Sequence, residues 1–465
     1  MRGALVGALL LCAACSTTRT APDISGLYER IALEGGDERD PVVVLPGILG
    51  SNLADDEGSV VWGAWNGVFA RPSRPEGLRS LAHPMTPGVP LAQRVDDVHP
   101  AGALESVEIR LLGIPIELAA YVRILRTLGV GGYLDADVAR ASFDGAGLDY
   151  GEEHFTCFQF AYDWRRDVVE SAQALDRFLR DEVLPAARRE GREGPIKVDV
   201  VAHSMGGLVV RWYLRYGAQD LPEDGSLPEP TWAGAELIDQ AVLVGTPNLG
   251  AVGALEQLLE GAALGPLFAD YPPAQVATFP SLYQLLPRER SGRVVDADGI
   301  PVEGLFEVAT WARNGWGLLD PDQEDVLERL LPDVPTAAHR RAIAEEHLSR
   351  CLTRAEQVHA ALDRPLDRPD GLELMLFAGD AEPTPHVVRV SGSDTEFVDL
   401  RPGDGTVTRA SALGDERLDE TWGPRLVTPI PWSRVQFVFS NHLGLTEHPS
   451  FVDNLLYALL EAPRP

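Results

Sequence analysis

The stretch from Val198 to Leu214 constrains the fold of this chain more than any other part of the sequence. An apolar run, Val198–Val201, leads into the sequence AHSMG at residues 202–206, and an apolar helical pattern follows. A serine in such a strand-to-helix turn is held in strained backbone geometry, so the residues two positions away on each side must be small. Ala202 and Gly206 meet this condition. The pattern predicts a nucleophile elbow in which Ser204 is lifted above the edge of a sheet.

Short apolar runs recur along the chain, with helical patterns between them. Continuous runs of this kind are typical of strands buried on both faces of a mostly parallel sheet. The predicted strands are Val42–Leu45, Thr156–Ala161, Lys197–Val201, Leu237–Val244, Leu372–Phe377 and Val435–Phe439. With the elbow, they predict the α/β class and an α/β-hydrolase fold with a mostly parallel central sheet.

Helical patterns replace the strand signal between Gly250 and Asp370. They are clearest at Ala254–Leu259, Glu324–Leu330 and Ala337–Leu362. Since 465 residues are many for a single domain, we expect one core with an inserted helical cap. The expected divisions are residues 41–250 for the first part of the core, 251–370 for the cap and 371–465 for the second part of the core.

A serine hydroxyl is a weak nucleophile, so an acid and a base must accompany Ser204. This fold class orders them along the chain as serine, acid and histidine. Asp404 lies in the glycine-framed loop Gly403–Val407 and is the predicted acid. Asp380, which follows the strand Leu372–Phe377 more closely, remains the alternative.

The predicted base is His442, in the loop after the last predicted strand. His448 stands just before Pro449, where a terminal helix begins, and we expect it to have a structural role. His203 belongs to the elbow and is expected to point away from the reacting groups. The order of the chain therefore favours Ser204, Asp404 and His442 as a catalytic triad.

Acyl chemistry on a serine also needs two backbone N–H donors for the oxyanion. Met205, directly after the nucleophile, is the predicted first donor. The second is expected from the loop PGILGS at residues 46–51, where we assign Ile48. The predicted mechanism requires no cofactor, and no cysteine cluster suggests a metal.

The N-terminus has the features of a bacterial export signal. Arg2 precedes a short apolar run, Ala4–Leu11, and the sequence CAACS follows at residues 12–16. It resembles a lipobox, so we assign residues 1–15 to a lipoprotein-type signal region. Cleavage is expected after Ala14, so that Cys15 becomes the lipidated N-terminus, and residues 16–40 are expected to form a linker. A plain secretory signal cleaved near Ala14 is the alternative. Both place the protein outside the cytoplasm, and the first also places it at a membrane surface.

Composition limits the partners of this chain. Its net charge of −30 argues against a nucleic-acid partner and against docking on anionic lipid by electrostatics alone, because both surfaces would repel it. No apolar run after the N-terminus is long enough to cross a bilayer. The remaining cysteines, Cys157 and Cys351, permit one disulfide but do not require it.

Four segments resemble the lecithin:cholesterol acyltransferase family, which includes lysosomal phospholipase A2 and phospholipid:diacylglycerol acyltransferases. They are PVVVLPGILGSNL at 41–53, the helix and GGY at 121–133, YDWRR at 162–166, and GTPNLG at 245–250. Asp404 and His442 match the acid and base of that family. Within YDWRR, we expect Asp163 and Arg165 to form an ion pair that holds the fold. The resemblance implies a lipid O-acyltransferase or a phospholipase A-type acyl hydrolase acting on lipid esters.

One departure from that family concerns the lid. Several members close it with a cysteine pair, whereas residues 60–69 here contain none. Trp62, Trp65 and Phe69 are expected to contact a bilayer or an acyl chain, with burial in the core as the alternative. A carboxylesterase or lipase that only hydrolyses, and a catalytically inactive binding protein on the same scaffold, are the alternative functions.

Overall fold

The computed structural model describes residues 39–63, 75–103, 108–111, 114–117, 124–125, 127–129, 133, 135, 156–189, 192–222, 224–263, 270–288, 290, 292–417 and 422–463. The expected signal region with Cys15, nearly all of the linker, Trp65, Phe69 and most of residues 121–133 lie outside this part of the chain.

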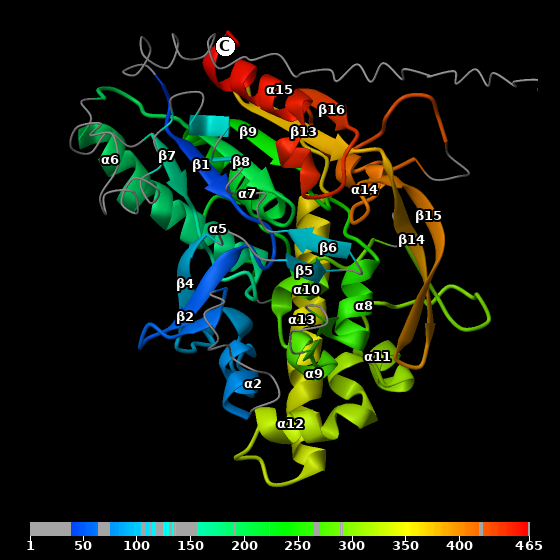
Figure 1. The fold of residues 1–465 in the computed structure, drawn as a ribbon. Helices are drawn as coiled ribbons and strands as arrows, with labels where there is room; N and C mark the ends of the chain where they lie inside the picture. Colours follow the sequence, from blue (N-terminus) through cyan, green and yellow to red (C-terminus); the bar gives the residue numbers. More distant parts are fainter. Residues whose placement is uncertain are drawn as a thin grey trace, which may run out of the picture.

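A six-stranded sheet in the order β16-β13-β9-β8-β1-β7 forms the centre of the molecule (Figure 1), and every neighbouring pair in it is parallel. The strands are β1 (Val42–Leu45), β7 (Cys157–Gln159), β8 (Val198–His203), β9 (Ile238–Val244), β13 (Glu373–Gly379) and β16 (Arg434–Val438). Each coincides with a predicted apolar run to within a few residues. The predicted α/β-hydrolase fold with a parallel central sheet is confirmed.

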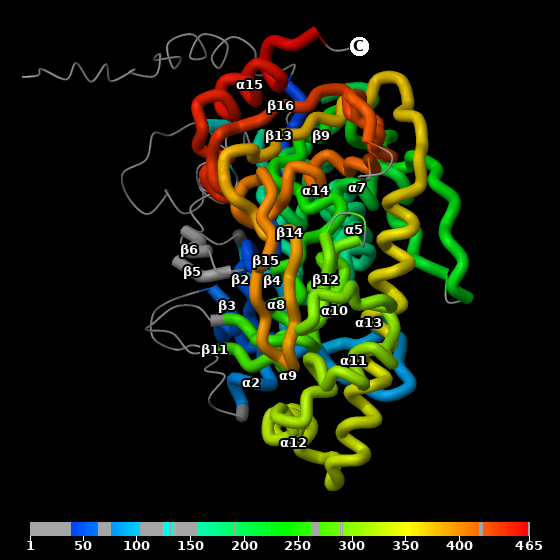
Figure 2. The backbone as a smooth tube through the Cα atoms, turned by 90° about the vertical axis from the view of Figure 1, so that its right-hand side faces the viewer, coloured from blue at the N-terminus to red at the C-terminus, as the bar shows by residue number. Residues whose placement is uncertain are grey.

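Helices cover both faces of this sheet. Figure 2 shows α15 (Pro449–Leu460) on one side of β9, β13 and β16, and α5 (Val168–Phe178) with α7 (Gly206–Tyr216) on the other. On the α15 side, the ring of Phe451 packs edge-on against Phe377 of β13, with centroids 5.0 Å apart. Every residue of α7 is buried. The nucleophile elbow therefore connects a buried strand to a buried helix, which leaves it little freedom to move.

The segment between β9 and β13 lies below the sheet in Figure 1 and is mainly helical. Its helices are α8 (Gly253–Glu260), α9 (Pro273–Val276), α10 (Pro280–Gln284), α11 (Val308–Asn314), α12 (Glu324–Leu330) and α13 (Ala337–Leu362). We expected no strands here, but β10 (Ala262–Ala263) pairs with β11 (Asp270–Tyr271), and β12 (Arg293–Val295) joins a second sheet. Strands of two or three residues are too short to produce a recognisable apolar pattern.

That second sheet is built on a long hairpin of β14 (Glu382–Ser391) and β15 (Asp394–Gly403), with the order β12-β14-β15. The tip of the hairpin is fastened to the helical segment. Trp316 donates its Nε1 hydrogen to the carbonyl oxygen of Gly392 at 3.0 Å, and Ser393 donates its hydroxyl to Asp320 at 2.9 Å. The base of the hairpin leads directly into Asp404, so one element spans the distance between the insertion and the predicted acid.

A small antiparallel sheet, in the order β3-β2-β4, extends the other side of the core. It consists of β2 (Ser51–Asp55), β3 (Val60–Trp62) and β4 (Val98–Ala103), and α2 (Pro75–Leu81) follows β3. The YDWRR sequence packs against this sheet. The predicted ion pair is present: Arg165 contacts Asp163 at 2.7 Å, contacts Asp96 at 2.9 Å and is fully buried.

Cys157 and Cys351 are both buried and do not form the optional disulfide with each other. No helix among the described residues is long and apolar enough to cross a membrane.

Candidate active site

Ser204 stands at the turn between β8 and α7 with a φ angle of 52°, in the left-handed region that residues with a side chain rarely adopt. Its amide donates to the carbonyl oxygen of Val244 at 2.8 Å, which fixes the turn to the end of β9. The glycines that follow are required by space. A Cβ atom on Gly206 would lie 2.5 Å from the carbonyl oxygen of Pro46, and one on Gly207 would lie 2.0 Å from Thr246 Oγ1.

The structure brings the three predicted side chains Ser204, His442 and Asp404 together in one hydrogen-bonded chain. His442 Nε2 lies 3.0 Å from Ser204 Oγ, and His442 Nδ1 lies 2.7 Å from Asp404 Oδ2. The carboxylate can only accept, so Nδ1 carries the hydrogen and Nε2 is left to accept from the serine hydroxyl. This arrangement has the hydrogen-bond directions that activation of a serine requires.

Asp404 is held in a fixed orientation at the end of β15. Its Oδ1 accepts from the backbone amides of Thr406 at 2.9 Å and Val407 at 2.6 Å, while its carbonyl oxygen accepts from the amide of His442 at 2.8 Å. Only 1% of the residue is exposed. With Oδ1 occupied by the backbone, Oδ2 is directed at the imidazole.

The alternative acid and base have other partners. Asp380 accepts from Arg409 at 2.7 Å in a partly exposed ion pair. His448 caps α15, because its Nδ1 accepts from the amide of Ser450 at 3.2 Å. This is the structural role expected for a residue at the start of the terminal helix.

Two further glycines allow the acid and the base to approach the sheet. A Cβ atom on Gly379, the last residue of β13, would lie 2.3 Å from Asp404 Cβ. One on Gly245, just after β9, would lie 3.1 Å from two ring atoms of His442. Sequence reasoning did not assign either residue to the site. The available signal was their position directly after an apolar run.

His203 was expected to point away from the reacting groups, and the structure corrects this. Its ring lies 4.7 Å from the ring of His442, and its Nε2 donates to the carbonyl oxygen of His442 at 3.0 Å. Burial lowers the pKa of His203 to about 3, so the ring is neutral near pH 7. His203 thus holds the backbone of the predicted base, an arrangement that only the packing of β8 against the loop after β16 reveals.

The predicted oxyanion donors lie on two adjoining segments. Met205 begins the turn into α7, and Ile48 lies in the loop after β1, where Leu49 has a φ angle of 64°. A Cβ atom on Gly206 would lie only 2.5 Å from the carbonyl oxygen of Pro46, so this loop packs directly against the start of α7. The amides of Ile48 and Met205 donate to no other residue in the described part of the chain. Both therefore remain free to donate to a ligand.

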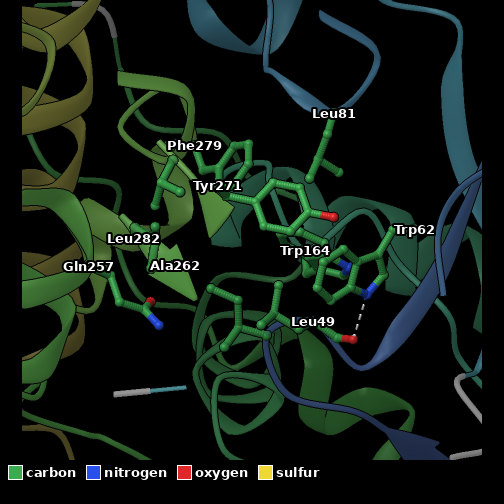
Figure 3. Close-up of a pocket in the computed structure, with 11 residues that line it drawn as sticks. Leu49, Trp62, Leu81, Trp164, Gln257, Ala262, Tyr271, Phe279 and Leu282 are labelled. Carbon is green, nitrogen blue, oxygen red and sulfur yellow. Dashed lines mark hydrogen bonds between the residues drawn. The ribbon is translucent and has the colours of Figure 1, made fainter. Parts of the chain in front are cut away.

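An apolar pocket opens beside Ile48 (Figure 3). The core side of its wall also includes Leu49, Trp62, Leu81 and Trp164. Trp62 is only 3% exposed, and its Nε1 donates to the carbonyl oxygen of Leu49 at 3.0 Å. Its ring packs edge-on against the ring of Trp164, with centroids 5.3 Å apart. Trp62 therefore belongs to the wall of this pocket and does not face a bilayer.

The insertion supplies the opposite wall. Its apolar residues there are Ala262, Val276, Phe279 and Leu282. About 360 Å³ of empty space, part of it open to solvent, lies between the walls. The helical segment and the core thus enclose one apolar chamber next to Ile48.

Only one group of described residues has the spacing of a metal site. The carboxylates of Asp40, Asp199 and Asp239 lie within 4.8 Å of one another. Asp199 and Asp239 occupy the second positions of β8 and β9, at the opposite end of these strands from Ser204. Arg192 neutralises part of the charge through Asp40 at 3.0 Å. This cluster does not belong to the serine site.

The sequence profile of lecithin:cholesterol acyltransferase matches residues 149–301, which include the YDWRR sequence, the nucleophile elbow and the GTPNLG loop. The predicted resemblance to that family is confirmed. No protein in the curated set matches by sequence.

Similarity to solved structures extends over a larger part of the chain. A chain from the crystal structure of the Tle4-Tli4 complex aligns with a TM-score of 0.52 and 16% identity, over 91% of this chain and 98% of that one. The phospholipase PlaB from Legionella pneumophila aligns with a TM-score of 0.24 and 15% identity, over 59% of this chain and 40% of that one. The first shares the overall fold, and the second is too distant to support an argument.

Proposed function

We propose that this protein is a serine-dependent acyl hydrolase or O-acyltransferase that acts on lipid esters. The observation that carries the proposal is the hydrogen-bonded chain from Ser204 through His442 to Asp404. The apolar side chains that line the pocket beside Ile48 offer an acyl chain an apolar surface next to the predicted oxyanion donor. The similarity to lecithin:cholesterol acyltransferase supports a lipid substrate.

The first half of the reaction transfers the acyl group to the enzyme. Ser204 Oγ attacks the ester carbonyl carbon while its proton moves to His442 Nε2. Asp404 stabilises the imidazolium, and the amides of Ile48 and Met205 donate to the oxyanion. Collapse of the tetrahedral intermediate breaks the bond to the alcohol, which leaves with the proton from His442. Ser204 then carries the acyl group as an ester.

The second half returns the enzyme to its starting state. Water or an alcohol gives a proton to His442 as its oxygen attacks the acyl carbonyl. The proton then returns to Ser204 Oγ as the acyl–serine bond breaks. Water yields a free fatty acid and an alcohol yields a new ester, so the same site supports both outcomes. Retention of all three side chains in bonding geometry argues against an inactive binding scaffold.

Incubation with a phospholipid labelled in its acyl chain tests this proposal. The purified protein is supplied with the phospholipid alone, and then with a long-chain alcohol or sterol added. We expect labelled fatty acid in the first case, and a labelled ester in the second if the enzyme is a transferase. Labelled fatty acid alone in both cases would identify a lipase. If the wild type and Ser204→Ala release equal amounts of label, the proposal is wrong.

We further propose that Cys15 anchors the protein to a membrane outside the cytoplasm. The net charge of −30 opposes attraction to anionic lipid, and Trp62 is buried in the core, so a covalent tether is the simplest means of attachment. Two or more acyl chains on one residue would give stable anchoring. Fractionation of expressing cells tests this, with Cys15→Ser expected in the soluble extracytoplasmic fraction. Recovery of the wild type in that same fraction would instead support an ordinary signal peptide.

A further inference from the structure

The loop at residues 46–51, which carries the predicted oxyanion donor Ile48, contains a strained turn. The amide of Gly50 donates to the carbonyl oxygen of Gly47 at 3.2 Å, so Ile48 and Leu49 are the two central residues of a β-turn. Leu49 has a φ angle of 64°, whereas the φ angle of Ile48 is not positive. These signs are those of a type II turn, whose second central residue is usually glycine. A leucine at this position is strained.

This turn sets the direction of the amide of Ile48. The carbonyl of Gly47 and the N–H of Ile48 belong to one peptide unit, and no peptide bond among the described residues is cis. In a trans peptide the carbonyl oxygen and the amide hydrogen point in opposite directions. Because the oxygen of Gly47 points across the turn to Gly50, the amide of Ile48 points out of the turn. The direction of the predicted oxyanion donor therefore depends on this one turn.

Trp62 of β3 bonds directly to the strained residue. Its Nε1 donates to the carbonyl oxygen of Leu49 at 3.0 Å (Figure 3). The amide of Gly50, in the same peptide unit as that carbonyl, donates to Gly47. The peptide unit between Leu49 and Gly50 is therefore bonded at both ends, and it cannot rotate without breaking a hydrogen bond. Strained backbone persists only where the surrounding structure holds it, and the bond from Trp62 is one of the contacts that hold Leu49.

Two residues of the YDWRR sequence bond to the two ends of the loop. Tyr162 Oη donates to the carbonyl oxygen of Pro46 at 2.9 Å, and Trp164 Nε1 donates to that of Ser51 at 3.2 Å. The backbone amide of Tyr162 also donates to Ser51 Oγ at 3.1 Å. Both residues are buried and follow β7, which pairs with β1, so the loops after two neighbouring strands meet here. The loop is thus fastened at both ends as well as at Leu49.

We propose that Trp62, Tyr162 and Trp164 are positioning residues, which hold the loop in the conformation that presents the amide of Ile48 to the oxyanion. This inference rests on the proposed function, because it assigns the loop to the acyl transfer reaction. Trp62 and Trp164 also line the apolar pocket, so their substitution would alter the contacts of an acyl chain as well. Tyr162 is not part of that wall, and its hydroxyl therefore offers the cleanest test.

The first experiment compares Tyr162→Phe with the matched control Tyr216→Phe. Each removes one buried hydroxyl that donates to a backbone carbonyl oxygen, that of Pro46 at 2.9 Å or that of Ala361 at 2.8 Å. Both variants should therefore have a lower Tm than the wild type. Only Tyr162→Phe should lower kcat for a 4-nitrophenyl ester, by about 10-fold and with KM unchanged, since loss of a whole oxyanion donor costs on the order of 100-fold or more. Equal kcat values for the two variants would overturn the inference.

A thiono ester, in which sulfur replaces the carbonyl oxygen, distinguishes a misplaced donor from a general loss of structure. Sulfur accepts hydrogen bonds weakly, so the oxyanion donors accelerate hydrolysis of the ester more than that of its thiono analogue. The ratio of the two kcat/KM values should fall in Tyr162→Phe by about the same factor as kcat, and it should keep the wild-type value in Tyr216→Phe. A lower kcat in Tyr162→Phe with an unchanged ratio would show that the hydroxyl supports only the fold, and would overturn the inference.

The strain at Leu49 provides a test for Trp62. Glycine adopts a positive φ angle readily, so a turn with glycine at this position needs the bond from Trp62 less. Trp62→Phe should lower kcat/KM in the wild-type background, and by a clearly smaller factor in the Leu49→Gly background. Each factor compares two proteins with the same residue at position 49, so the direct effect of Leu49→Gly on the pocket cancels. Equal factors in the two backgrounds would overturn the role proposed for Trp62.

Failure of this inference can be separated from failure of the proposed function. If the wild type hydrolyses esters through Ser204 but Tyr162→Phe behaves as Tyr216→Phe does, the proposed function stands and only this inference falls. If the wild type hydrolyses no ester, both fall, because the loop then has no oxyanion to meet. The expected result is a fall of both kcat and the ester-to-thiono ratio in Tyr162→Phe, with neither changed in Tyr216→Phe.

Discussion

Substitution of Gly379 by alanine tests the geometry of the predicted acid without removing any catalytic atom. The added Cβ would lie 2.3 Å from Asp404 Cβ and 2.9 Å from its Cα, whereas ordinary contacts begin near 3.4 Å. Relief of the closest contact requires a shift of 3.4 − 2.3, or about 1.1 Å. The φ angle of Gly379 is not positive, so its backbone conformation is open to alanine. The predicted consequence is a displaced Asp404 in a folded protein.

A misplacement of about 1 Å can cost on the order of 100-fold in rate. We therefore expect Gly379→Ala to lower kcat for a 4-nitrophenyl ester by about that factor, with little change in KM. The matched control is Gly423→Ala, since a Cβ there would meet no atom within 4 Å. Circular dichroism and thermal unfolding show whether each variant is folded. A folded Gly379→Ala with the kcat of the wild type would refute the assignment of Asp404.

The remaining predictions concern histidines. His442→Ala should abolish turnover. His448→Ala should keep turnover but lower the free energy of unfolding by about 1 kcal/mol, because the N-cap of α15 is lost. The reverse pattern in rate and unfolding assays would exchange the two roles. His203→Leu should lower kcat and leave KM unchanged. His203→Gln restores a hydrogen-bond donor and should recover part of the lost kcat. Equal kcat values for these two variants would count against a role of His203 in positioning His442. Burial lowers the pKa of His203, His347 and His359 to about 3, whereas the unfolded chain has values near 6.5. The unfolded state therefore binds more protons below pH 6.5, and Tm should fall as pH drops from about 6.5 towards 3. A constant Tm across this range would contradict burial of these histidines in the neutral form.

The strands of the central sheet could be predicted because each contains a short cluster of apolar residues next to polar ones. The strand β1 is VVVL, for example, and β9 ends in the apolar run AVLV. The hairpin of β14 and β15 could not be predicted in this way. In β15 exposed and half-exposed side chains alternate and the sequence carries Asp, Glu and Arg, so its pattern does not differ from that of a polar loop.

The residues of the candidate site were recoverable to different degrees. Ser204, Asp404 and His442 follow from chain order and local sequence, because each reacting group needs a particular side chain in a particular connection. The contributions of Gly379 and His203 depend on contacts between segments far apart in the chain. Such contacts leave no periodic pattern. Trp62 was ambiguous for the same reason, since a short aromatic run suits either a pocket wall or a surface.

Reaction with a fluorophosphonate probe tests the central claim most directly, because the probe forms a covalent bond only with an activated serine. The purified wild type should be labelled, and peptide mass analysis should place the label on Ser204. Ser204→Ala and heat-unfolded protein should remain unlabelled. His442→Ala should react far more slowly, since His442 Nε2 lies 3.0 Å from Ser204 Oγ and is the proposed base. A folded wild type that takes up no label, or Ser204→Ala labelled as well as the wild type, would contradict the account.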